Sequence, residues 1–298
     1  MLRSAIIGLG KIGLGYDINK NKNTFISHAN SLFNHPKFKL IAGVDINPSK
    51  RFRFKIKFNL NTYKSVNDLL KNEQLDCVVV ANNFSNKIKI FEKIARSNSV
   101  KFILFEKPFD IKDNELNKIN RLSKKYKVKY AVNFQRSFNK QYLNFINNIS
   151  FPKKTDKLNI TIFYSKNFLS NVSHYLFLIS RFLSRPKNIK VVGNNLIVQL
   201  KFSTIQFIKL NGQFSYNHLI IFKNKFKYEI TTREEKLKIY KLKKDIDYEG
   251  IFIFKKFKEV KISTNKTQKY VLDNIFDNMK GRSKSLFKQN DFKKYLNL

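Results

Sequence analysis

The run Gly8-Leu9-Gly10-Lys11-Ile12-Gly13 decides the fold, and it directly follows the apolar residues Ala5-Ile6-Ile7. It fits the pattern G-x-G-x-x-G, in which the glycines allow a tight turn between a buried strand and a helix. The same glycines let a pyrophosphate group approach the backbone closely. A glycine turn that only packs a helix on a strand is the alternative interpretation. The position directly after an apolar strand favours a dinucleotide-binding turn.

Around this turn, short apolar runs alternate with amphipathic stretches, which is the pattern of a parallel sheet with crossover helices. The expected strands are apolar almost throughout, as strands buried on both faces should be: Arg3–Gly8, Lys39–Val44, Asp76–Ala81, Lys101–Phe105 and Val128–Val132. The expected helices lie between them: Ser27–Asn34, Pro48–Lys57, Ser65–Lys71, Phe84–Ser97 and Lys112–Tyr126. We therefore expect an α/β fold whose N-terminal domain, residues 1–134, is a doubly wound Rossmann domain.

After residue 134 the pattern changes to strands that follow one another with turn signals between them. The stretches expected to be helical are Phe138–Asn148, Val172–Leu183 and Thr267–Met279. The expected strands are Lys157–Tyr164, Leu196–Phe202, Thr204–Leu210, His218–Phe222, Lys225–Thr231, Lys236–Leu242 and Ile251–Phe254. We expect residues 135–298 to form a second domain of the α+β class, with a mostly antiparallel open sheet.

Two groups of residues at strand ends carry chemistry. Asp45 ends the second expected strand, where a carboxylate can accept hydrogen bonds from both ribose hydroxyls of NAD and repel a 2′-phosphate. Asp45 lies 32 residues after Gly13 rather than the usual number of about 20, which indicates an insertion at Gly15–Phe25. Because Lys50 and Arg51 are close by, NADP is not excluded as the coenzyme.

The second group is Glu106-Lys107-Pro108, at the end of the fifth expected strand. Ligands of a doubly wound sheet gather at the carboxyl ends of its strands. A lysine there can donate a hydrogen bond to a reacting hydroxyl and stabilise the alkoxide that the hydroxyl becomes, and the proline fixes the backbone next to it. If this triplet is considered alone, the simpler interpretation is a surface Glu-Lys pair before a turn.

The net charge of +38 comes from 59 basic and 21 acidic residues, and it is spread evenly. Residues 1–150 carry 28 basic and 10 acidic side chains, and residues 151–298 carry 31 and 11. Because 49 of the basic residues are lysines and no single segment concentrates them, we interpret them as solvated surface. Specific nucleic-acid binding is therefore not expected, and a polyanion-binding protein is the lesser alternative. A positive field still favours anionic small substrates.

The composition also bounds the cellular setting. A content of 42% hydrophobic residues supports a sizeable core, and the single cysteine, Cys77, fits a reducing compartment. No apolar run approaches the roughly 18 residues of a membrane span. The first residues enter a strand at once and leave no room for a signal peptide, so we expect a cytoplasmic protein. Four histidines without metal-ligand spacing predict no metal site.

The chain resembles the Gfo/Idh/MocA oxidoreductases, and within them the sugar dehydrogenases associated with surface-polysaccharide synthesis. The segments that carry this resemblance extend over most of the chain. They are the glycine run continued to Tyr16-Asp17, Gly43-Val44-Asp45, Glu106-Lys107-Pro108, Ala131 to Arg136, Tyr164 to His174, and Val271-Leu272-Asp273-Asn274-Ile275.

The resemblance implies hydride transfer between NAD and a sugar hydroxyl, with a nucleotide sugar as the expected substrate and a homo-oligomer as the expected assembly. It makes residues 135–298 the substrate-binding and oligomerisation domain. It makes Lys107 and His174 the catalytic residues, and His174 suits the role because histidine titrates near neutral pH. The expected substrate-binding residues are Arg136 and Asn171. The expected coenzyme-binding residues are Gly8, Gly10, Lys11, Ile12, Gly13, Asp45 and Glu106.

The chain departs from the family's pattern on the substrate side and near the nicotinamide. Many relatives carry an aspartate four residues before the histidine and an acidic residue after it, where this chain has Ser170 and Phe177. Asn82-Asn83 and Lys87 stand where relatives have Thr-Pro and then a histidine, and Ser137 replaces a second arginine. These departures leave open an alternative function, a catalytically idle dinucleotide-binding relative that acts as a sensor or assembly partner.

Overall fold

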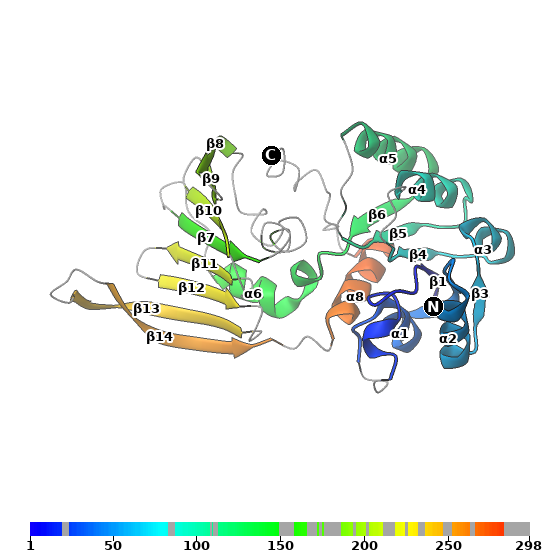
Figure 1. Cartoon of the computed structure of the whole chain (residues 1–298), viewed down its shortest axis with the longest axis horizontal. Helices are drawn as coiled ribbons and strands as arrows, with labels where there is room; N and C mark the ends of the chain where they lie inside the picture. Colours follow the sequence, from blue (N-terminus) through cyan, green and yellow to red (C-terminus); the bar gives the residue numbers. More distant parts are fainter. Residues whose placement is uncertain are drawn as a thin grey trace. The chain divides into compact units, whose positions relative to one another are not determined.

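The computed structural model describes residues 1–19, 24–82, 87–107, 109, 113–148, 158–165, 172, 175, 186–192, 195–200, 203–210, 218–223, 226–231, 236–246, 252–262 and 266–282 (Figure 1). Contacts between Cα atoms divide the chain into two compact units. Unit 1 consists of Met1–Gln135 and Asn265–Lys288, and unit 2 of Arg136–Thr264 and Gln289–Leu298.

Unit 1 is built on a parallel sheet of six strands in the order β3-β2-β1-β4-β5-β6. The strands are β1 (Leu2–Ile7), β2 (Phe38–Val44), β3 (Asn61–Tyr63), β4 (Cys77–Val80), β5 (Phe102–Phe105) and β6 (Lys129–Val132). The order reverses between β1 and β4, so the expected doubly wound Rossmann fold is confirmed. At such a reversal the carboxyl ends of neighbouring strands leave a crevice for ligands.

Five helices link these strands: α1 (His28–Asn34), α2 (Pro48–Phe58), α3 (Val66–Asn72), α4 (Lys87–Arg96) and α5 (Asp113–Tyr126). Ser27, Asn47 and Ser65 cap α1, α2 and α3, since each side chain accepts a hydrogen bond from a backbone N–H three residues later. In Figure 1, α4 and α5 lie on one side of the sheet, and α1 and α2 lie on the other. Within unit 1 the sequence pattern predicts all five of these helices and misses the short polar strand β3. In unit 2 it also misses the strand at Pro186–Val192.

The core of unit 1 encloses Cys77, whose side chain is fully buried in β4. Burial raises the pKa of its thiol to about 12, and the charge of neighbouring Asp76 adds to the rise. Because the thiolate is the reactive form, Cys77 is expected to resist iodoacetamide at pH 8 in the folded protein and to react fully in denaturant. Mass spectrometry of the labelled chain checks this, and rapid labelling of the native protein would contradict the burial.

Helix α8 (Thr267–Met279) packs in unit 1, although the sequence pattern places it with the second domain. Its first turn is tied down because the Gln268 N–H donates to Phe25 O at 3.1 Å. Its last turn is tied down by Lys129 Nζ, which donates to Asn278 Oδ1 at 3.0 Å. Between these points α8 buries Val271, Leu272 and Ile275. An apolar face at helical spacing predicts that a helix is buried, and does not identify the domain against which it packs.

Unit 2 contains an eight-stranded sheet in the order β14-β13-β12-β11-β7-β10-β9-β8. Only β7 and β10 pair in parallel, so the mostly antiparallel sheet is confirmed. Its strands are β7 (Leu158–Tyr164), β8 (Pro186–Val192), β9 (Asn195–Leu200), β10 (Ser203–Lys209), β11 (His218–Lys223), β12 (Phe226–Thr231), β13 (Lys236–Ile246) and β14 (Phe252–Lys261). The 3-10 turn η2 (Gln135–Phe138) and helix α6 (Lys140–Asn148) precede them.

Along β7, the side chains of Leu158, Ile160, Ile162 and Tyr164 are buried and alternate with more exposed ones. This alternation is the period of a strand with one covered face. Most of the helix expected at Val172–Leu183 lies outside the described residues, where only residues 172 and 175 are described. No helix within the described residues has the length and hydropathy of a membrane span.

Candidate active site

The glycine turn after β1 is shaped by contacts that leave no room for side chains at two of its three glycines. Gly8 has φ of +98°, a backbone conformation that favours glycine, and a Cβ there would lie 2.9 Å from the carbonyl carbon of Ala81. A Cβ on Gly13 would overlap the carbonyl oxygen of Gly8. A Cβ on Gly10 would meet no atom within 4 Å, so the backbone at Gly10 is open to a ligand. These are the roles that the sequence motif assigns to the three glycines.

The expected insertion lies between the turn and α1. The chain leaves the turn through the 3-10 helix η1 (Gly15–Asp17), and α1 begins only at His28. The His28 N–H nevertheless donates to Ile12 O at 3.0 Å, so the start of α1 continues the turn across the insertion. The loop is closed by the buried carboxylate of Asp17, which accepts hydrogen bonds from Ile26 N at 3.0 Å and Ser27 N at 3.1 Å.

Asp45 lies at the end of β2 and faces the glycine turn. Its Oδ2 accepts a hydrogen bond from Leu9 N at 2.8 Å, and its Oδ1 accepts one from Asn47 N at 2.9 Å. These bonds fix the orientation of the carboxylate and leave it further acceptor sites, since each oxygen carries two lone pairs. Lys50 Nζ is 3.8 Å from Oδ2, whereas Arg51 Nη1 donates to the carbonyl oxygens of Asp45 and Ile46. Arg51 therefore binds the backbone beneath the site.

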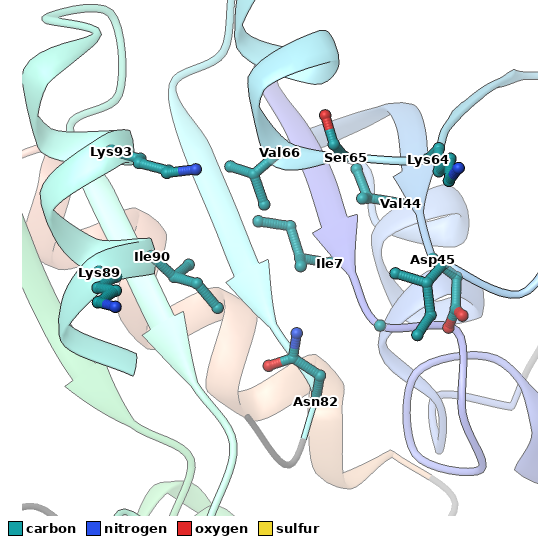
Figure 2. Close-up of a pocket in the computed structure, with 12 residues that line it drawn as sticks. Ile7, Val44, Asp45, Lys64, Ser65, Val66, Asn82, Lys89, Ile90 and Lys93 are labelled. Atoms are coloured by element: carbon teal, nitrogen blue, oxygen red, sulfur yellow. The ribbon is translucent and has the colours of Figure 1, made fainter. Parts of the chain in front are cut away.

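A cavity of about 320 Å³ opens beside Gly8 and Asp45, at the carboxyl ends of the strands (Figure 2). Asn82, directly after β4, contributes an amide whose oxygen and nitrogen are both buried and have no hydrogen-bond partner among the described residues. In Figure 2 the side chain of Lys93 extends from α4 toward Val66. The other lining residues are Ile7, Val44, Ile46, Lys64, Ser65, Lys89 and Ile90. Apolar walls with an unpartnered amide suit a flat heterocycle that carries hydrogen-bonding groups, such as adenine.

Glu106 and Lys107 follow β5, and their side chains have different surroundings. The Glu106 carboxylate is buried, and its Oε1 lies 2.6 Å from Nε2 of the buried His28. Asn133 Nδ2 donates to the same oxygen, and Lys107 N donates to Oε2 at 3.1 Å. Lys107 itself is half-buried. The Glu106 side chain thus contacts protein groups, and the sequence pattern did not single out its partners His28 and Asn133.

The residues expected on the substrate side are only partly described. Arg136 lies in unit 2 with its guanidinium carbon 5.6 Å from the centroid of the fully buried Tyr175 ring. His174 and Asn171 lie outside the described residues, so their positions stay predictions. Lys87, which replaces a histidine common in relatives, is buried, and its Nζ lies 5.3 Å from the centroid of the Phe109 ring. The described residues contain no group of three or more His, Cys, Asp or Glu that could hold a metal ion.

Residues 2–134 match the family model of the Gfo/Idh/MocA proteins, which is described as "Oxidoreductase family, NAD-binding Rossmann fold". This part of the chain is similar to the NAD-binding domain of the Gfo/Idh/MocA oxidoreductases. The glycine turn, the fixed carboxylate of Asp45 and the adjoining cavity are what an NAD-binding domain of this family requires. No curated protein sequence matches the chain significantly.

Solved structures of dehydrogenases share the fold over almost the whole chain. The dehydrogenase MviM from Clostridium difficile has a TM-score of 0.71 at 14% identity, with 98% of this chain and 96% of that chain covered. The WlbA dehydrogenase from Bordetella pertussis, in complex with NADH and UDP-GlcNAcA, has a TM-score of 0.68 at 13% identity, with 97% and 91% covered. At such identities the likeness establishes the fold of this chain and leaves its substrate open.

Proposed function

We propose that this protein is an NAD-dependent dehydrogenase that transfers a hydride between the nicotinamide and a hydroxyl-bearing carbon of a sugar. The observation that carries the proposal is the glycine turn backed by Asp45, because such a turn would hold a coenzyme at the carboxyl ends of the strands, where Lys107 follows β5. A nucleotide sugar is the substrate class that we favour. WlbA holds UDP-GlcNAcA together with NADH, and a net charge of +38 attracts anionic substrates.

The chain's own residues divide the work of binding. The backbone around Gly10 and Gly13, with Lys11 and Ile12, would hold the pyrophosphate, and the fixed carboxylate of Asp45 would accept hydrogen bonds from the ribose hydroxyls. Two features fit the coenzyme: the open position at Gly10, and the Asn82 amide in the cavity, which has no hydrogen-bond partner within the described part of the chain. When bound, NAD supplies an electrophilic ring carbon that accepts two electrons as hydride.

Proton movement falls to two side chains. Lys107 would donate a hydrogen bond to the reacting hydroxyl oxygen and stabilise its developing negative charge. His174 would take the hydroxyl proton as the hydride leaves the carbon that bears this hydroxyl, so that a ketone forms. In the reverse direction His174 would return the proton. Arg136 and Asn171 would bind the rest of the substrate, and surface-polysaccharide synthesis in the cytoplasm by a homo-oligomer is the setting that the resemblance favours.

A substrate panel tests the proposal. Nucleotide sugars and free polyols are offered with NAD and with NADP, and the absorbance of reduced coenzyme is followed at 340 nm. We expect turnover with at least one nucleotide sugar. Bound NADH without turnover on any member of a broad panel would instead support the catalytically idle relative.

The coenzyme preference gives a further prediction at Asp45. In the variant Asp45→Asn the carboxylate becomes a neutral amide, so the charge-assisted bonds to the ribose weaken and the repulsion of a 2′-phosphate disappears. We expect NADH to bind about tenfold more weakly and NADPH to bind as well as before or better, since bonds to charged groups are worth about 1.5–3 kcal/mol. Fluorescence titration with both coenzymes measures this.

Asp277→Asn is the matched control, because it makes the same charge change at a partly exposed residue of α8, 3.9 Å from Lys37. Its affinities for both coenzymes should equal those of the wild type. An equal loss of NADH and NADPH affinity in Asp45→Asn would show that Asp45 only supports the turn and does not contact the ribose.

A further inference from the structure

A buried polar cluster connects the start of α1 with the end of β5. His28 Nε2 and Glu106 Oε1 are 2.6 Å apart, and the two side chains are only 1% and 9% exposed. Asn133 Nδ2, at the end of β6, donates to Glu106 Oε1 and also to Gln268 Oε1 of α8 at 3.2 Å. Four elements of unit 1 thus contribute one polar side chain each to a site from which water is nearly excluded.

His28 is joined through its backbone to the coenzyme turn, and the carboxylate of Glu106 is joined to the backbone of Lys107. On one side, the His28 N–H donates to Ile12 O, and the Ala29 N–H donates to Gly13 O at 2.9 Å. On the other side, Glu106 Oε2 accepts the N–H of Lys107 at 3.1 Å. A series of hydrogen bonds therefore connects the coenzyme turn to Lys107. Within this series, the contact between the His28 imidazole and the Glu106 carboxylate joins two side chains.

We propose that His28 is a positioning residue, which aims Lys107 at the coenzyme site by holding the Glu106 carboxylate. The proposal rests on the role of Lys107 in the proposed function. Without the imidazole, the buried carboxylate keeps Asn133 Nδ2 and Lys107 N as donors but has lost one partner. It then turns toward other donors or draws in water, because incomplete pairing of a buried charge is costly. Either response weakens the bond from Lys107 N to Glu106 Oε2 and lets the lysine backbone shift. A misplacement of about 1 Å is enough to slow a reaction roughly 100-fold.

His35 provides a matched control at the other end of α1. It is as buried as His28, and its Nε2 lies 3.3 Å from a carboxylate oxygen of Asp273. Asp273 also has Lys269 at 2.9 Å and Lys37 at 3.4 Å, so it keeps cationic partners when the imidazole is removed. The loss of His35 removes a buried histidine beside a carboxylate without touching Glu106 or Lys107.

The test compares the variants His28→Asn, His28→Gln and His35→Asn. The asparagine amide is too short to replace the Nε2 contact, whereas the glutamine amide can reach Glu106 with a neutral donor. Hydrogen exchange of the Lys107 amide is measured first, since this N–H donates directly to Glu106. We expect exchange about tenfold faster in His28→Asn, an intermediate rate in His28→Gln, and the wild-type rate in His35→Asn. If His28→Asn does not fold, the exchange rate of the Lys107 amide in His28→Gln is compared with that of the wild type, and faster exchange supports the proposal.

Kinetics supplies the second measurement once a substrate is known. We expect kcat of His28→Asn to fall about 100-fold while the Kd for NADH stays near the wild-type value, because the backbone bond from His28 N to Ile12 O persists. Exchange at Lys107 that is unchanged in both His28 variants, or equally fast in His35→Asn, overturns the proposal. If the wild type turns over no substrate, the proposed function fails, and the order of exchange rates still decides whether His28 positions Lys107.

Discussion

Replacement of Gly13 by alanine is expected to abolish NADH binding and to destabilise unit 1. The added Cβ would overlap the carbonyl oxygen of Gly8, so either the turn or the start of α1 must move. Gly13 O also accepts the Ala29 N–H, and the shift therefore disturbs the first turn of α1. Overpacking of this kind costs about 1–3 kcal/mol, which lowers the melting temperature of a domain of this size by several degrees. Fluorescence titration with NADH and thermal unfolding measure the two effects.

Gly10→Ala separates binding from stability in the same turn. No atom lies within 4 Å of a Cβ at Gly10, so the variant should melt at the wild-type temperature. The methyl group would occupy the open side of the turn, where we place the pyrophosphate, and NADH binding should still be lost. If Gly10→Ala binds NADH with wild-type affinity, the pyrophosphate does not bind at this turn. This conclusion holds whatever the result for Gly13→Ala.

The features that the sequence predicts best are those fixed by local rules. The glycine run predicts the turn, because only glycine tolerates the positive φ at Gly8 and the close approach at Gly13. Apolar runs predict the buried strands, and Pro48 with the cap Asn47 predicts the start of α2. Strand β3 is not predicted in this way, because Asn61-Thr62-Tyr63 is short and polar and lies at the edge of the sheet.

The features that the sequence does not predict depend on tertiary packing. His28 and Glu106 are 78 positions apart in the sequence, and no local sequence pattern predicts that their side chains are in contact. The assignment of α8 to unit 1 likewise depends on partners such as Phe25 and Lys129, which lie far away in the sequence. Asn82 is recognisable in the sequence only as a departure from the family's pattern. Its amide lines the cavity and has no hydrogen-bond partner among the described residues.

Lys107→Ala and His174→Ala are expected to reduce turnover most strongly of all substitutions, by about 10²–10⁴-fold each, with the affinity for NADH near that of the wild type. Without the ammonium group the developing alkoxide has lost its hydrogen-bond donor. Without the imidazole, the hydroxyl proton has no acceptor with a pKa near neutrality. Steady-state kinetics with the substrate found in the panel, together with NADH titration, checks both variants.

Lys118→Ala is the control for the lost positive charge, because Lys118 is a partly exposed residue of α5 that pairs with Glu92. Its turnover should match the wild type, which would exclude a general effect of net charge on an anionic substrate. The double variant Lys107→Ala/His174→Ala tests whether the two side chains act on the same hydroxyl. If both side chains act on one hydroxyl, the second substitution adds little to the first, since residues that act as a unit are not additive. Two losses that multiply would mean that Lys107 and His174 act on different groups, and the assignment of one shared hydroxyl would be wrong.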